Sequence, residues 1–163
     1  MHVTAEQALW FLPFIAPICF YVAWCDMKFM KIPNRSVLLL TAVFAVVGLF
    51  ALPFDAYLWR WVHLLVILLA GFILSSLGQV GAGDAKFAAA MAPFIAREDA
   101  WAILMLFATI LLAAFATHRT ARMIPAVRTA TPDWQSWERR RDFPMGFALG
   151  GTLVIYFLLP LLT

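Results

Sequence analysis

Long apolar runs separated by short polar stretches make up most of the sequence. The runs cover residues 8–25, 36–52, 61–77, 85–96, 100–117 and 143–162. A helix needs about 20 mostly apolar residues to cross a bilayer, so the pattern predicts about six transmembrane helices. The fourth run is short for a crossing. We favour a helix that continues through Arg97 toward the far interface, and a re-entrant segment is the alternative.

The composition also indicates a polytopic membrane protein. Of the 163 residues, 64% are hydrophobic and 13% are charged, and the mean hydropathy is +0.89. Soluble domains hold about 45–50% apolar and about 25% charged residues. The composition therefore excludes a water-soluble globular protein and a disordered chain. We expect an all-α, polytopic integral membrane protein with a single transmembrane domain over residues 1–163.

The positions of the basic residues predict the orientation in the membrane. Ten Lys and Arg residues fall in the first, third and fifth loops between the runs, and two, Arg60 and Arg97, fall in the second and fourth loops. The positive-inside rule places the basic loops in the cytoplasm and both termini in the periplasm or outside. Because the basic residues lie between apolar runs, the net charge of +3 does not indicate nucleic-acid binding. The first seven residues lack Lys and Arg, so no removable signal peptide is expected.

Asp26 and Asp84 carry the candidate chemistry. Asp26 follows the first apolar run and Asp84 opens the fourth, so the predicted topology puts both at the cytoplasmic margin of the membrane. Carboxylates in such positions are costly and usually functional. Two neighbouring carboxylates can share one proton, so that one takes a proton from water while the other polarises a peptide carbonyl. The dipoles of the two expected helices favour an ionised Asp84 and a protonated Asp26.

Residues near the two aspartates are candidates for shaping the site. Lys28 and Lys86 each follow an aspartate by two positions. They can supply cations to the carboxylates, although both also fit charges that set the topology and reach the headgroups. Gly78, Gly81 and Gly83 precede or flank Asp84 and leave room for an extended peptide.

Simpler roles are expected for most other polar and small residues. The acidic residues of the predicted outer side are expected to be solvated: Glu6, Asp55, Glu98 and Asp99. The two cysteines are expected to be buried apolar residues, with no metal site and no cofactor. His118 is expected at the interface, and the arginine-rich segment 118–142 is expected in the headgroup layer, in contact with membrane lipids. Gly146 and Gly150 are spaced for close helix packing.

Three motifs resemble those of type IV prepilin peptidases. Gly81-Ala82-Gly83-Asp84 resembles the GxGD motif of intramembrane aspartyl proteases. Asp26 with Ile32-Pro33-Asn34 is similar to the first-aspartate motif, and Pro144-Met145-Gly146 to the Pro-x-Gly element of the last span. The resemblance covers essentially the whole chain and implies that Asp26 and Asp84 are catalytic. The residues that it and the local pattern imply for substrate binding or site shaping are Gly81, Gly83, Lys86, Lys28, Pro33, Asn34, Pro144 and Gly146.

The resemblance implies a membrane-embedded aspartic endopeptidase that removes the short basic leader from prepilins at the cytoplasmic face. Larger members of the family carry a zinc-bearing cytoplasmic insertion with two CxxC pairs and also methylate the new pilin terminus. The first loop here has about ten residues and no CxxC, so we expect a peptidase without that insertion. The small size resembles the Flp (Tad) pilus branch, and the archaeal preflagellin peptidases share the two aspartates.

Two other functions remain open on the sequence. A proton- or cation-coupled transporter would use intramembrane carboxylates, which it would hold near the bilayer centre on broken helices. A non-catalytic subunit of a pilus-assembly machine would hold each aspartate in a separate pair with a lysine. The sequence does not fix the oligomeric state.

Overall fold

All secondary structure in the described chain is helical. The computed structural model describes residues 1–139 and 142–162. Its elements are α1 (Ala5–Phe29), α2 (Asn34–Ala51), α3 (Phe54–Ser76), α4 (Ala82–Met91), the 3-10 turns η1 (Ala92–Phe94) and η2 (Arg97–Asp99), α5 (Ala100–Met123), α6 (Pro125–Ala130), the 3-10 turn η3 (Gln135–Trp137) and α7 (Met145–Leu162). No strand occurs in this part of the chain. The expected all-α fold class is confirmed.

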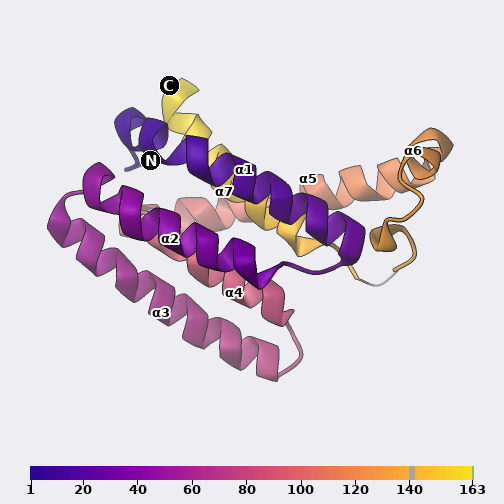
Figure 1. The fold of residues 1–163 in the computed structure, drawn as a ribbon, viewed down its shortest axis with the longest axis horizontal. Helices are drawn as coiled ribbons and strands as arrows, with labels where there is room; N and C mark the ends of the chain where they lie inside the picture. Colours follow the sequence, from indigo (N-terminus) through magenta and orange to yellow (C-terminus); the bar gives the residue numbers. More distant parts are fainter. Residues whose placement is uncertain (140–141, 163) are drawn as a thin grey trace.

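The long helices run back and forth, so that both termini lie at one end of the bundle (Figure 1). We call this end the terminal end and the opposite end, where α1 finishes and α4 begins, the aspartate end. Five helical segments are long and apolar enough to cross a membrane: α1, α2, α3, α7 and the stretch Arg97–Met123. The chain is therefore a multi-pass membrane protein.

The fourth apolar run forms only a short helix. α4 has 10 residues and runs back along α3 toward the terminal end, where η1 and η2 lead into α5 (Figure 1). It is not among the five segments long enough to cross a membrane by themselves. A sixth crossing by α4 and η1 stays a prediction, as does the orientation of the bundle in the membrane.

Several helices extend beyond the predicted apolar runs. α1 reaches Phe29, so Asp26 lies inside its last turn instead of in a loop. α3 begins at Phe54, seven residues before the predicted start, and α5 continues to Met123 into the segment expected to be a loop. Polar side chains at a helix end can reach the headgroup layer while their backbone stays helical, so the end of an apolar run does not mark the end of its helix.

α1 and α7 form the centre of the bundle and pack closely along each other. A Cβ atom at Gly150 would lie 3.0 Å from the carbonyl oxygen of Cys19, and one at Gly146 would lie 3.1 Å from Cγ1 of Val22. The glycines therefore allow close approach of the two helices, as their spacing predicted. Cys19 and Cys25 are buried and unbonded to each other, as expected.

A cluster of buried rings joins the helices near the terminal end. Phe11 of α1 packs edge-on against Phe94 of η1, with ring centroids 5.2 Å apart, and Phe44 of α2 packs against the same ring at 5.3 Å. Phe157 of α7 completes the cluster, 5.4 Å from Phe11. The cluster holds η1 against three other helices, so the short fourth segment is firmly attached to the bundle.

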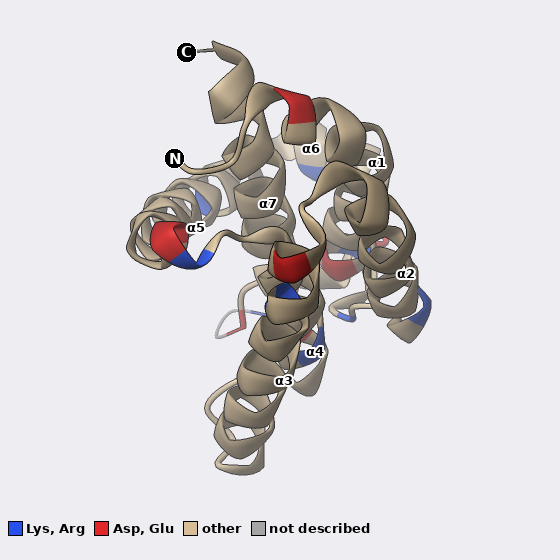
Figure 2. Ribbon diagram, turned by 90° about the vertical axis from the view of Figure 1, so that its left-hand side faces the viewer, with Lys and Arg blue, Asp and Glu red and all other residues tan. Residues whose placement is uncertain are grey.

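The outer surfaces of the bundle are apolar. α3 and α5 flank the other helices, and most of their Leu, Ile, Val and Phe side chains are exposed. Figure 2 shows that charged residues gather near the helix ends, whereas the long middle stretches are free of charge. Such apolar surfaces suit contact with the acyl chains of the bilayer.

Asp99, which was expected to be solvated, and Arg60, which was expected in a loop, are both buried at the terminal end. Asp99 is only 2% exposed, and its carboxylate accepts hydrogen bonds from the backbone N–H of His2 (2.8 Å) and the hydroxyl of Tyr156 (2.7 Å). Arg60, which we placed in a loop, lies in α3 and donates to the carbonyl of Phe94 (3.1 Å). The expectation of a solvated Asp99 is wrong because the start of α5 packs against α7 and the N-terminal residues.

Candidate active site

Asp26 lies where the end of α1 meets the start of α7. It is 5% exposed, and its Oδ2 accepts a hydrogen bond of 2.7 Å from the backbone N–H of Gly146. Gly146 is the second residue of α7, so its N–H is one of the amides that a helix leaves unpaired at its start. The carboxylate of Asp26 thus caps a neighbouring helix.

Close packing at Gly146 fixes this contact. A Cβ atom there would lie 3.0 Å from both Cβ and Oδ2 of Asp26. Pro144 is buried just before α7, and its carbonyl accepts the N–H of Phe147 at 3.3 Å, which begins the helix at this point. Proline and glycine therefore set where α7 starts and how near it comes to Asp26.

Asp84 is the third residue of α4, and its side chain is half-buried. The carboxylate folds back over Gly81, the residue directly before the helix. A Cβ atom at Gly81 would lie 2.5 Å from Oδ2 of Asp84. Gly81 is the N-cap of α4 and has an ordinary extended conformation, with φ −63°. The glycine is required there by the space that the Asp84 carboxylate occupies.

Asp26 and Asp84 lie at the same end of the bundle, in the last turn of α1 and the first turn of α4, and both of these helices pack against α7. Both carboxylates lie at the positive end of a helix, since Asp84 is in the first turn of α4 and Asp26 is at the start of α7. The helix-dipole argument for a protonated Asp26 is therefore incomplete, because it considered only the end of its own helix.

The loop between α1 and α2 holds the start of α4 in position. A Cβ atom at Gly83 would lie 3.4 Å from Cβ of Ile32, which is buried. Lys86 donates from its Nζ to Oδ1 of Asn34, at 3.4 Å. Pro33 is the N-cap of α2, directly before Asn34. Residues from the first-aspartate motif and from the GxGD motif thus contact each other.

The two lysines do not pair with the two aspartates. Among the described residues, no ion pair joins Lys28 or Lys86 to Asp26 or Asp84. The Nζ of Lys28 lies over the ring of Phe29, 5.4 Å from its centroid, and Lys86 is exposed. Both lysines lie near the site, but their direct partners are an aromatic ring and an amide.

The glycines before Asp84 do not all face open space. Gly81 and Gly83 contact Asp84 and Ile32, so much of the room predicted for an extended peptide is filled by the protein itself. Gly78 has no atom within 4 Å of its missing Cβ, and its φ of +73° places it in a tight turn after α3. Of the three, only Gly78 borders open space and needs glycine for its backbone conformation.

Comparison with known proteins identifies the family. Residues 13–118 match the type IV leader peptidase family. This chain belongs to that family. No curated protein and no solved structure gives a match. The matched region of this leader peptidase contains both aspartates but ends before α7, so the contribution of Pro144 and Gly146 rests on their contacts with Asp26 and α1.

An aromatic cluster packs against α1 and α5 of this leader peptidase. Trp134 packs edge-on against Trp24 of α1 at 5.4 Å and stacks on Trp137 at 5.6 Å. His118 stacks on the other side of Trp137, at 5.0 Å. His118 is buried by this stack with Trp137. Its expected position at the membrane interface stays a prediction.

A metal site was not expected from the sequence, and the search for one covers the residues that the structure describes. No group of three or more His, Cys, Asp or Glu residues that could hold an ion occurs among them.

The arginine-rich segment 118–142 is described only in part. Two of its six arginines, Arg140 and Arg141, lie outside the described residues. Sequence reasoning missed the Gly146 N–H as a partner of Asp26, and the proline directly before the helix start is the signal that points to it.

Proposed function

We propose that this leader peptidase is an aspartic endopeptidase that removes the short basic leader from prepilins, and that Asp26 and Asp84 are its catalytic pair. The observation that carries the proposal is that both carboxylates lie at the aspartate end and each is at the positive end of a helix, with a glycine packed against each one. The region that matches the leader peptidase family includes both aspartates, which supports their assignment as the catalytic pair.

The chemistry follows from two carboxyl groups that share one proton. The ionised carboxylate takes a proton from a water molecule, and the water oxygen attacks the scissile carbonyl carbon. The protonated carboxyl group donates to the carbonyl oxygen as the tetrahedral intermediate forms. As the intermediate collapses, one of its hydroxyl groups returns a proton to the ionised carboxylate, the C–N bond breaks, and the leaving amine takes up a proton from the other carboxyl group, so that the pair again shares one proton. Neither aspartate alone can fill both roles.

We place the reaction at the cytoplasmic face of a bacterial inner membrane. The basic loop 26–35 and the end of α5 with α6 lie at the aspartate end (Figure 1). Arg60, near the start of α3, and Arg97, in η2, belong to segments at the opposite end. The positive-inside rule then puts the aspartate end in the cytoplasm. A pilin precursor with its leader in the cytoplasm and its hydrophobic helix in the bilayer would present the bond between them at this level. The short first loop favours the Flp-type branch of substrates.

We also assign membrane lipids as partners of segment 118–142. Met123 is 82% exposed and Ile124 is 44% exposed, next to Arg122 and Arg128. Apolar side chains beside arginines suit the boundary between acyl chains and anionic headgroups. The aromatic contacts with Trp24 would then hold a lipid-bound segment next to the site.

Neither alternative function gains support from a specific contact. The assembly-subunit hypothesis requires Asp–Lys ion pairs, and none is formed by Asp26 or Asp84 with Lys28 or Lys86 in the described chain. The transporter hypothesis requires carboxylates on broken helices near the middle of the bilayer. Asp26 lies instead in the last turn of an unbroken α1.

Cleavage of a co-expressed prepilin tests the proposal. We expect Asp26→Asn and Asp84→Asn each to abolish the gel shift that marks leader removal. Asp55→Asn is the matched control, because Asp55 is an exposed aspartate in the first turn of α3 at the terminal end. All variants are compared at equal membrane levels. Processing by either Asn variant at the rate of the control would show that the pair is not catalytic.

A further inference from the structure

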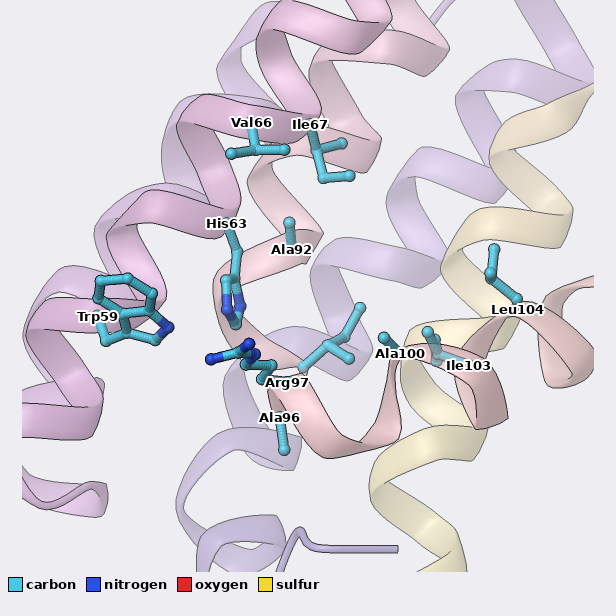
Figure 3. Close-up of a pocket in the computed structure, with 11 residues that line it drawn as sticks. Trp59, His63, Val66, Ile67, Ala92, Ala96, Arg97, Ala100, Ile103 and Leu104 are labelled. Carbon is cyan, nitrogen blue, oxygen red and sulfur yellow. The ribbon is translucent and has the colours of Figure 1, made fainter.

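A groove opens at the terminal end between α3, η1 and the first turns of α5 (Figure 3). It has a volume of about 390 Å³, and its walls are formed largely by apolar side chains, including Val66 and Ile67 of α3 and Ile103 and Leu104 of α5. The groove exists because α4 and η1 are too short to fill the space between the two long helices. It is far from the aspartate end, so the proposed peptidase mechanism makes no use of it.

The groove ends in a smaller polar cavity. This cavity has a volume of about 250 Å³ and shares Trp59, His63 and Arg97 with the groove. Arg60 and Glu98 line the cavity but not the groove. The apolar groove therefore continues into a cavity lined by charged residues of both signs. A phospholipid has the same arrangement, with an apolar acyl chain joined to a charged headgroup.

The charged side chains at the cavity differ in their exposure and in their partners within the protein. Arg60 is buried and donates to the carbonyl of Phe94. Arg97 and Glu98 are exposed, and the side chain of neither forms a hydrogen bond or an ion pair with another described residue. Arg97 and His63 both line the groove and the smaller cavity (Figure 3). Arg97 is also unusual by position, because the predicted outer loops hold few basic residues.

We propose that this site binds a glycerophospholipid with an ethanolamine headgroup. One acyl chain fills the apolar groove, and the phosphate lies against Arg97 and His63. Arginine suits phosphate because its guanidinium offers several N–H donors in one plane. The primary ammonium donates to the carboxylate of Glu98. Trp59, whose indole lies at the same end, suits the level of the headgroups. A choline headgroup has no N–H to give Glu98, so the site distinguishes the two lipids.

Native mass spectrometry of the full chain in detergent tests the site. The protein is titrated with phosphatidylethanolamine and phosphatidylcholine that carry the same acyl chains. We expect the wild type to retain the ethanolamine lipid about tenfold better, as one charge-assisted hydrogen bond implies. Glu98→Gln should reduce this preference to about twofold or less, while Arg97→Gln should weaken retention of both lipids by about tenfold.

Two further variants separate this site from general lipid contact. Ala100→Trp places a large apolar side chain in the groove and should displace either lipid without changing any charge. Arg35→Gln is the matched control for Arg97→Gln, because Arg35 is an exposed arginine in the first turn of α2, at the other end of the bundle and outside segment 118–142. Normal elution from a sizing column shows that each variant is folded.

Several results would overturn the proposal. Equal retention of both lipids by the wild type, or retention unaffected by Arg97→Gln and Ala100→Trp, would show ordinary annular lipid. Stronger retention of phosphatidylglycerol than of the ethanolamine lipid would show a site for anionic lipid and would overturn the role of Glu98. Because the readout is lipid mass and not cleavage, the result is independent of the peptidase assignment.

Discussion

At the scale of single residues, the absence of a side chain at Gly146 is as important as the carboxylate that it contacts. Its missing Cβ would lie 3.0 Å from Asp26, so Gly146→Ala must push α7 away from α1 or turn the carboxylate. We expect a loss of about 1–3 kcal/mol in stability, as overpacking usually costs, and at least a tenfold lower kcat/KM for prepilin cleavage. Gly151→Ala is the control, because its Cβ would meet Ile110 at an ordinary 3.5 Å. Equal kcat/KM for the two variants would contradict the argument.

Gly81 tests the position of Asp84 without disturbing the fold. Its φ of −63° suits alanine, and the nearest atom to a new Cβ is the carboxylate oxygen of Asp84 at 2.5 Å. We therefore expect Gly81→Ala to lower prepilin cleavage at least tenfold while the melting temperature in detergent stays within about 2 °C of the wild type.

We expect Gly78→Ala to lower stability without lowering cleavage, the reverse of the effect expected for Gly81→Ala. Its φ of +73° strains any L side chain, but a new Cβ would touch nothing. We expect a loss of about 1 kcal/mol in stability with cleavage unchanged per folded molecule. If Gly81→Ala cleaved normally and Gly78→Ala did not, the open glycine would be the functional one, as in the extended-peptide hypothesis.

At the scale of elements, the contact between α2 and α4 links the two aspartate motifs. The hydrogen bond from Lys86 to Asn34 is exposed and 3.4 Å long, so it should contribute only about 0.5 kcal/mol to stability. Asn34→Ala, Lys86→Met and the double variant form a cycle measured by kcat/KM. We expect each single change to slow cleavage a few-fold and the double change to add little more, because both remove one contact. Fully additive losses would show that the two residues act separately.

The sequence identified Asp26 and Asp84 because a carboxylate beside an apolar run is conspicuous in a membrane protein. It also predicted close packing at Gly146 and Gly150 from their spacing. It could not show that α7 begins where its free N–H meets Asp26, because that depends on the packing of helices 120 residues apart. Asp99 was misplaced for the same reason. In sequence it is one more charge in a polar turn, and its partners come from the N-terminus and the last helix.

At the scale of the whole molecule, the two ends of the bundle are built differently. At the aspartate end, Asp26 has one backbone donor. At the terminal end, Asp99 is held by His2 and by Tyr156, whose hydroxyl also accepts the N–H of Ala96. These bonds fasten α5, α7 and the N-terminal residues to one another. The terminal end should therefore stay closed while any opening that admits a substrate takes place at the aspartate end.

Asp99→Asn and Tyr156→Phe test this division of roles. Each breaks bonds in the buried network, so each should lower the free energy of unfolding by about 1–3 kcal/mol. Cleavage by the folded protein should stay within twofold of the wild type, because neither residue touches the aspartate pair. Thermal unfolding in detergent measures the first effect and prepilin processing below the transition measures the second. A large loss of cleavage with unchanged stability would place Asp99 in the reaction and would show that the two ends are coupled. Loss of stability alone would show that this buried network stabilises the fold without taking part in the reaction at the aspartate end.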